Sequence, residues 1–107
     1  MIKEITILGR RMSIKHVTKP ELKEIYPDPA EEILGWFSPS ENCIYLWSGL
    51  EKDSYRRVLL HEITHAYMAV SGLSNLLSDE QEEAISDLFE SFVEQFNNKK
   101  LVEELTE

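Results

Sequence analysis

Cysteine is almost absent from this chain: Cys43 is the single one, and an internal disulfide is therefore excluded. Glycine and proline are also scarce, with 4 of each among 107 residues, which argues against a collagen-like, disordered or linker-dominated chain. No apolar run approaches the roughly 20 residues that a membrane span requires, and the N-terminal segment lacks the apolar stretch of a signal peptide. These absences predict a cytoplasmic protein with no membrane partner, stabilised by packing or by a metal ion.

Positive charge is in short supply as well. The chain has 11 basic and 20 acidic side chains and a formal net charge of −9. Nucleic acids and anionic membranes attract basic surfaces, so the composition argues against both as non-specific partners. Most of the acidity lies in residues 79–107, which carry two basic and ten acidic side chains, whereas residues 1–78 carry nine and ten. This run indicates either a solvated helix face or a surface that attracts cations or basic peptides.

The remaining composition predicts one globular domain, residues 1–107, since 42% of the residues are hydrophobic and 29% are charged. Short β-favouring runs dominate the first half of the chain. Strands are expected at residues 5–8, 12–17, 35–37 and 43–47, with a short helix at residues 21–26 after Pro20. The first two strands flank Gly9 and form a hairpin or lie as neighbours, and the turn-forming segment 38–42 predicts a hairpin of the last two.

Two long helices are predicted in the second half. Ser48 and Glu51 have the spacing of a capping box, and Gly72 is well placed to end the helix that they begin. The apolar residues of this helix point in nearly every direction, which predicts a buried helix. A second capping box, Ser78 with Gln81, begins the next helix. That helix runs through Asn97 and carries one broad apolar stripe, formed by Ile85, Leu88, Phe89, Phe92, Val93 and Phe96.

The sequence His61-Glu62-Ile63-Thr64-His65 lies in the middle of the first long helix. Histidines at positions i and i+4 share one helical face, where both imidazoles can reach one zinc ion at about 2.0–2.1 Å. Glu62 can then act as the general base on a zinc-bound water. Two core histidines without a metal are the weaker interpretation, because each would need its own hydrogen-bond partners.

A catalytic zinc ion usually has three protein ligands and one position open to water, so a third ligand is required. His16 lies far upstream in a predicted strand, and no spacing supports a metal role for it. The acidic second helix returns against the histidine helix after a short loop and offers Glu80, Glu82, Glu83, Asp87 and Glu90. Glu82 lies nearer the apolar stripe than Glu83, so periodicity alone favours Glu82.

Residues 61–66 (HEITHA) and 83–89 (EAISDLF) together resemble the paired motifs of the gluzincins, the thermolysin-like zinc peptidases. The resemblance extends over about residues 58–98, and the chain length points to the minigluzincins, their minimal single-domain members. It implies an α+β fold with a small, mainly antiparallel sheet, a backing helix, a buried active-site helix and a C-terminal glutamate helix.

The resemblance also implies roles by position. His61, His65 and Glu83 would be the zinc ligands, Glu62 the catalytic base, and Asp87 the carboxylate that orients a ligand histidine. Asp87 lies one helical turn after Glu83, on the same face, where it can accept a hydrogen bond from the far nitrogen of His61. The expected activity is therefore that of a zinc metalloendopeptidase acting on a peptide or protein substrate.

In the family, an edge strand above the active-site helix pairs with the extended substrate. We expect residues 43–47, the strand nearest in sequence to the histidine helix, to be that edge, with Tyr45 and Trp47 lining a side-chain pocket. The alternative for both aromatics is packing in the core. Cys43 is most simply explained as a small buried apolar residue.

The minigluzincin resemblance further implies latency through the C-terminal segment, here residues 98–107. Its apolar side chains, Leu101, Val102 and Leu105, would occupy the cleft, and exchange of the segment between two chains would give a homodimer. A terminal helix without a regulatory role is the alternative. Two other functions stay open: a zinc-stabilised binding or regulatory protein that cuts no peptide, and a peptidase dedicated to one repressor-like partner.

Overall fold

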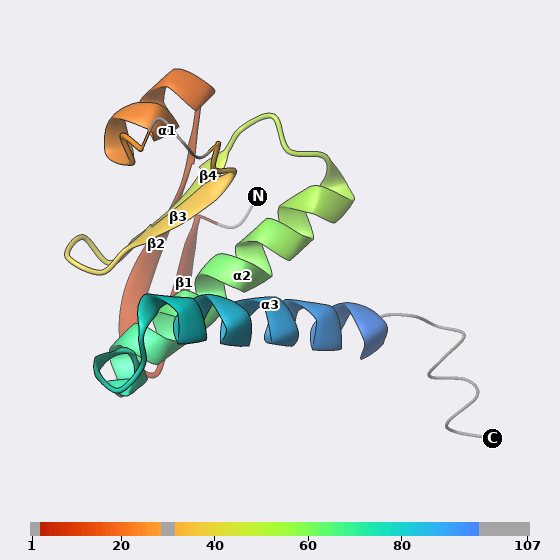
Figure 1. Cartoon of the computed structure of the whole chain (residues 1–107). Helices are drawn as coiled ribbons and strands as arrows, with labels where there is room; N and C mark the ends of the chain where they lie inside the picture. The colour runs from red at the N-terminus through yellow and green to blue at the C-terminus, as the bar shows by residue number, and fades with distance from the viewer. Residues whose placement is uncertain (1–2, 29–31, 97–107) are drawn as a thin grey trace.

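The computed structural model describes residues 3–28 and 32–96, and it has the expected α+β fold. Its elements are β1 (Glu4–Ile7), β2 (Arg10–Val17), α1 (Lys19–Ile25), β3 (Gly35–Ser38), β4 (Cys43–Trp47), α2 (Lys52–Ser71), the short 3₁₀ helix η1 (Leu73–Asn75) and α3 (Asp79–Phe96). The strands form one sheet, with α1 and α2 on opposite faces and α3 packed across α2 (Figure 1). The expected inhibitory segment 98–107 lies outside the described residues.

The sheet has the strand order β1-β2-β4-β3. Strands β1 and β2 form an antiparallel hairpin around Gly9, β3 and β4 form a second one, and β2 and β4 pair in parallel. The predicted β3–β4 hairpin is confirmed, and of the two alternatives for the first two strands the structure has the hairpin; the sheet is mainly antiparallel. Because β4 is hydrogen-bonded on both sides, the expectation that residues 43–47 form an edge strand is wrong. The edge on that side of the sheet is β3.

A packing requirement explains the central position of β4. Its first four residues, 43–46, are all buried, and a strand without an exposed face needs cover on both sides. Ile44 and Leu46 point toward α2 and join the larger core, whereas Cys43 and Tyr45 point toward α1 and join a second cluster. Trp47 packs against this second cluster too. The histidine helix and the aromatic residues of β4 therefore lie on opposite sides of the sheet.

Helix α2 begins later than the sequence predicts. Its N-cap is Glu51, which makes no side-chain capping bond, so the predicted capping box at Ser48 is wrong. The cause is the parallel ladder: the Ser48 N–H donates to the Val17 carbonyl at 2.8 Å, which ties Ser48 to the end of the sheet, in the turn that follows β4. The predicted end at Gly72 is confirmed, with a left-handed φ of 84°. From residue 58 to residue 70 every side chain except Tyr67 is buried or half-buried.

Helix α3 begins with the predicted capping box. The Gln81 N–H donates to the Ser78 hydroxyl at 3.1 Å, and the Ser78 N–H donates to the Gln81 side chain at 2.9 Å. The apolar stripe of this helix does not face α2, because Ser86 is fully buried and most of the stripe is exposed. The exposed fractions are 72% for Leu88, 47% for Phe89, 54% for Phe92 and 52% for Phe96. A polar face of α3 therefore contacts the histidine helix.

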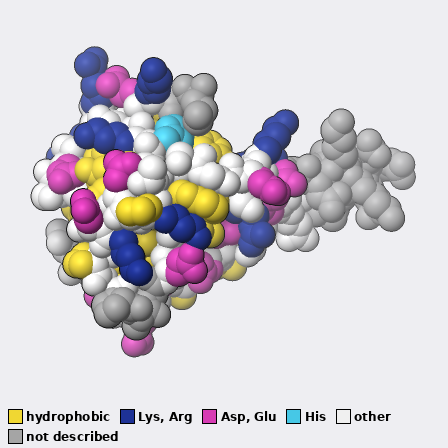
Figure 2. All heavy atoms as spheres, turned by 90° about the horizontal axis from the view of Figure 1, so that it is seen from above, with side chains coloured by type: hydrophobic (Ala, Val, Ile, Leu, Met, Phe, Trp, Pro, Cys, Tyr) yellow, Lys and Arg dark blue, Asp and Glu magenta, His cyan; other side chains and the backbone are white. Residues whose placement is uncertain are grey.

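The surface seen from above carries both signs of charge. Figure 2 shows lysine and arginine side chains interspersed with carboxylates and small apolar areas on this face. None of the helices in the described part of the chain has the length and apolarity that crossing a bilayer requires. Positive charge, although scarce in the composition, is thus available on part of the surface.

The two capping boxes predicted from the sequence give a direct test of this fold. We expect Ser78→Ala to lower the free energy of unfolding by about 1 kcal/mol, because the first turn of α3 loses its side-chain acceptor. Ser48→Ala, which removes no capping bond, is the matched control and should change stability by less than about 0.5 kcal/mol. Urea unfolding of both variants measures the difference. Equal losses would contradict the late start of α2.

Candidate metal centre

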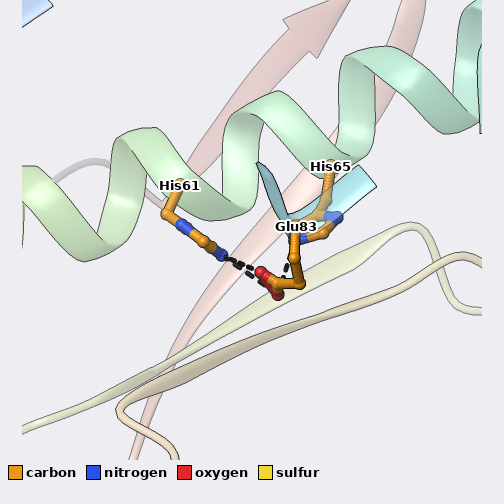
Figure 3. A group of neighbouring side chains, drawn as sticks. All are labelled: His61, His65 and Glu83. Atoms are coloured by element: carbon orange, nitrogen blue, oxygen red, sulfur yellow. Dashed lines mark hydrogen bonds and ion pairs between the residues drawn. The ribbon is translucent and has the colours of Figure 1, made fainter. Parts of the chain in front are cut away.

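Two consecutive turns of α2 and the first half of α3 bring His61, His65 and Glu83 together. The His61 Nε2 atom lies 2.9 Å from one carboxylate oxygen of Glu83, and the His65 Nε2 atom lies 3.1 Å from the other. Figure 3 shows the two imidazoles and the carboxylate pointing toward one another. One donor atom from each residue lies within 4.8 Å of the other two. Two imidazole nitrogens and one carboxylate form a donor set typical of catalytic zinc sites, so these residues fit the ion.

Each histidine also has a carboxylate at its other nitrogen. The His65 Nδ1 atom lies 2.8 Å from Glu82, and the His61 Nδ1 atom lies 3.3 Å from Asp87 and 3.4 Å from Glu90. An Nδ1–H that donates to a carboxylate leaves the Nε2 lone pair free to bind a metal. The structure therefore places Glu83 at the two Nε2 atoms and Glu82 at the back of His65, although periodicity favoured Glu82 as the ligand.

A second group, His61 with Asp87 and Glu90, also has its donor atoms within 4.8 Å of one another. Here a cation from the protein is already present, because the Arg57 Nε atom donates to Glu90 at 3.0 Å. The guanidinium partly neutralises the charge that would attract an ion. The group around Glu83 is consequently the stronger candidate for a metal.

The position of α3 is fixed by contacts at several points along the helix. Ser86 is fully buried, one turn after Glu82 and Glu83, and a side chain this small allows the two helices to approach closely. Farther along, Arg56 pairs with Glu94 at 2.9 Å. These contacts, together with Arg57 and Glu90, hold the carboxylates of α3 against the histidine face of α2.

Glu62 lies between the histidines in sequence and is almost completely buried, with 7% of its surface exposed. Burial raises the pKa of its carboxyl to about 7, and the charge of Glu83 contributes in the same direction. The neighbouring His65 and His61 and a hydrogen bond from the backbone N–H of Phe37 oppose the rise. A carboxyl with a pKa near neutral can both accept and donate a proton, which suits general acid–base chemistry.

The candidate metal centre borders an open groove of about 1080 Å³. Its floor is α2, with Glu62, His65 and Ala69, and one wall is the beginning of α3. The opposite wall is the edge strand β3 and the residue that follows it, contributing Gly35, Trp36, Phe37 and Pro39. A substrate in this groove would lie against a free strand edge and beside Glu62.

Tyr45 and Trp47 do not line this groove. The Tyr45 hydroxyl donates to the Glu41 carboxylate, and the Trp47 ring lies 4.4 Å from the Lys19 ammonium, both on the face of the sheet that α1 covers. Their expected position in a substrate pocket is therefore not supported. The described aromatic residues that line the groove are Tyr26, Trp36 and Phe37, and Trp36 also packs against Tyr45 on the α1 face. The sequence predicts a strand at residues 35–37, but only the strand order shows that β3 is the edge of the sheet.

The two other residues singled out in the sequence lie away from the centre. His16 hydrogen-bonds through Nε2 to the Tyr55 hydroxyl at 2.9 Å. Cys43 is buried, and burial raises the pKa of its thiol, which disfavours the thiolate that binds metals. No family model matches the chain, and neither a curated protein nor a solved structure matches it at a significant level. The case for a metal centre rests on the donor atoms described above.

We expect the wild-type chain to bind one zinc ion, and His61→Ala, His65→Ala and Glu83→Gln to abolish binding, because two remaining ligands cannot compete with water and chelators. Elemental analysis after dialysis measures the metal content. Glu82→Gln is the matched control from the same helical turn. It should retain zinc with an affinity lower by roughly 10–100-fold, as expected for an outer partner of a ligand histidine. Zinc loss in Glu82→Gln with full retention in Glu83→Gln would contradict the assignment.

The raised pKa of Glu62 predicts that the free energy of unfolding of the metal-free protein decreases as the pH rises. The folded state holds this proton more tightly than the unfolded state. The contribution of protonated Glu62 to the free energy of unfolding is therefore fully present below about pH 4.5 and is lost as the pH rises through about 7. Glu62→Gln removes this loss, so the variant should gain up to about 3 kcal/mol relative to wild type between pH 4.5 and pH 8. Urea unfolding with a chelator at both pH values measures it. A stability difference independent of pH would contradict the burial of an ionisable Glu62.

Proposed function

We propose that this protein is a zinc-dependent metalloendopeptidase of the gluzincin type. The observation that carries the proposal is the convergence of His61, His65 and Glu83 beside a groove that also holds the buried carboxyl of Glu62. Three ligand side chains with the groove beside them suit a catalytic ion, whereas a closed structural zinc site requires four protein ligands. The resemblance of residues 58–98 to the gluzincins supports the same activity.

In this proposal, the ion and the side chains near it have separate roles in peptide hydrolysis. A bound zinc ion would polarise the scissile carbonyl and lower the pKa of water toward about 7. Glu62, whose buried carboxyl lines the groove beside the zinc ligands, takes the proton from the attacking water and delivers it to the leaving amine. The hydrogen bond from the Phe37 N–H holds this carboxyl at the β3 side of the groove. Glu82 fixes the tautomer and ring orientation of His65.

Strand β3 supplies the means of binding an extended peptide. It pairs with β4 on one side, and no other described strand pairs with its second side, which faces the groove. Backbone groups along such an edge can add a peptide as a further strand. Pairing of this kind holds the substrate through its main chain and leaves sequence preference to the side chains of the groove.

We expect Glu62→Gln to bind zinc like the wild type and to lower peptide hydrolysis by roughly 100- to 10,000-fold, since the amide cannot accept the proton. Quenched fluorescent peptides measure the rate, and zinc content is measured on the same samples. Glu24→Gln, which alters an exposed carboxylate on α1, is the control and should leave the rate unchanged.

A variant truncated after Asn98 is measured in the same assay to test latency. A zinc-loaded truncated protein that is more active than the intact chain would support the latency implied by the minigluzincin resemblance. Absence of hydrolysis by both zinc-loaded proteins would contradict the peptidase proposal and favour a zinc-stabilised binding protein.

A further inference from the structure

The groove beside the metal centre has an unusual balance of charge. Six of the residues that line it are carboxylates: Glu62, Asp79, Glu80, Glu82, Glu83 and Asp87. None of the 17 described lining residues is a lysine or an arginine, although the chain contains 11 of them. Lysine and arginine side chains do lie at the surface of the protein, as the face shown in Figure 2 illustrates, but none is among the described residues that line the groove. A ligand in the groove therefore meets a negative wall.

Four of these carboxylates are engaged with the metal centre. Glu83 lies at the ligand nitrogens, Glu82 and Asp87 lie at the back of the histidines, and Glu62 is buried beneath them. Asp79 and Glu80 differ from the other four. They are exposed in the first turn of α3, and neither forms an ion pair with another described residue. Their charge is available to a ligand.

The opposite wall of the groove is apolar and aromatic. Phe37, of which 7% is exposed, and Pro39 come from β3 and its end. Trp36 and Ile33 line the groove from the side that α1 covers, where the Trp36 ring lies 5.9 Å from that of Tyr26. Lysine and arginine side chains combine a long apolar stem with a terminal charge, and they lie well across such a pair of surfaces. Arginine also stacks favourably on tryptophan and tyrosine rings. Acidic and neutral peptides gain no electrostatic attraction from the carboxylates of α3.

We propose that this groove selects basic peptides, with a lysine or arginine side chain of the substrate paired to Asp79 and Glu80. The inference rests on the proposed function, because it concerns the same groove and the same strand edge. A structural explanation also exists for two carboxylates in a first helical turn, since they interact favourably with the helix dipole. That explanation predicts no effect on the choice of peptide, so the two are separated by experiment.

The test measures binding and requires no turnover. Zinc-loaded Glu62→Gln protein is titrated into two fluorescently labelled eight-residue peptides that differ only in two lysines, replaced in the second peptide by glutamines. We expect the lysine peptide to bind about tenfold more tightly at low salt, as one or two partly desolvated ion pairs would give. The preference should shrink as the salt concentration rises.

Removing the two charges should remove the preference. In the Glu62→Gln background, Asp79→Asn with Glu80→Gln should bring the two affinities to within about threefold, because the carboxylates that remain in the groove, Glu82, Glu83 and Asp87, are engaged with the histidines and the bound zinc. Glu51→Gln with Asp53→Asn is the matched control: it makes the same pair of substitutions at exposed positions where α2 begins, outside the groove, and should retain the preference. The ratio of two affinities in one variant is insensitive to partial unfolding, and Glu80→Gln alone provides a milder substitution.

The outcomes are distinct. Equal binding of both peptides to the starting protein, an unchanged preference after the Asp79 and Glu80 substitutions, or an equal loss in the control would each overturn the proposal. Hydrolysis by the wild type without charge preference would overturn this inference and leave the peptidase proposal intact. Selective binding of the lysine peptide, without hydrolysis by the zinc-loaded wild type or by the zinc-loaded chain truncated after Asn98, would overturn the peptidase proposal and support the basic-peptide groove.

Discussion

The contact between the polar face of α3 and the histidine face of α2 is the interaction on which the rest of the site depends. An amphipathic helix ordinarily turns its apolar stripe inward, yet α3 leaves Phe89, Phe92 and Phe96 exposed and places Glu82, Glu83 and Ser86 against α2. Several carboxylates held close together repel one another unless a cation lies among them. Arg56 and Arg57 supply cations at one end of this contact, and the two histidines face it at the other. Docking of α3 and metal binding are therefore expected to stabilise each other.

Sequence reasoning succeeds for features that depend on residues close together in the chain. The spacing of His61 and His65 follows from helix geometry alone, and the Ser78 capping box depends on residues three apart. The Gly72 end of α2 depends on one residue that tolerates a left-handed backbone. Both hairpins likewise depend on local turns. Each of these features is determined by neighbours in the sequence, so each is visible in the sequence.

The errors concern contacts between distant segments. Ser48 has the spacing of a helix cap, but its N–H pairs with Val17, 31 positions earlier, and that pairing delays the helix. The central position of β4 depends on its parallel pairing with β2, which no local pattern encodes. The helical wheel favours Glu82 only if the apolar stripe marks the inward face of α3. Apolar periodicity identifies a stripe, but it does not reveal which neighbour, if any, covers that stripe.

The hydrogen bond between the Phe37 N–H and Glu62 joins this buried carboxyl to the strand edge. Successive residues on a strand lie about 3.3 Å apart, and a peptide added to β3 can pair only in steps of that ladder. The pairing register, counted from Phe37, would then determine which amide of a bound peptide lies over the Glu62 carboxyl. In the proposed peptidase, a change of register by two residues would move the cut along the same peptide without altering His61, His65 or Glu83.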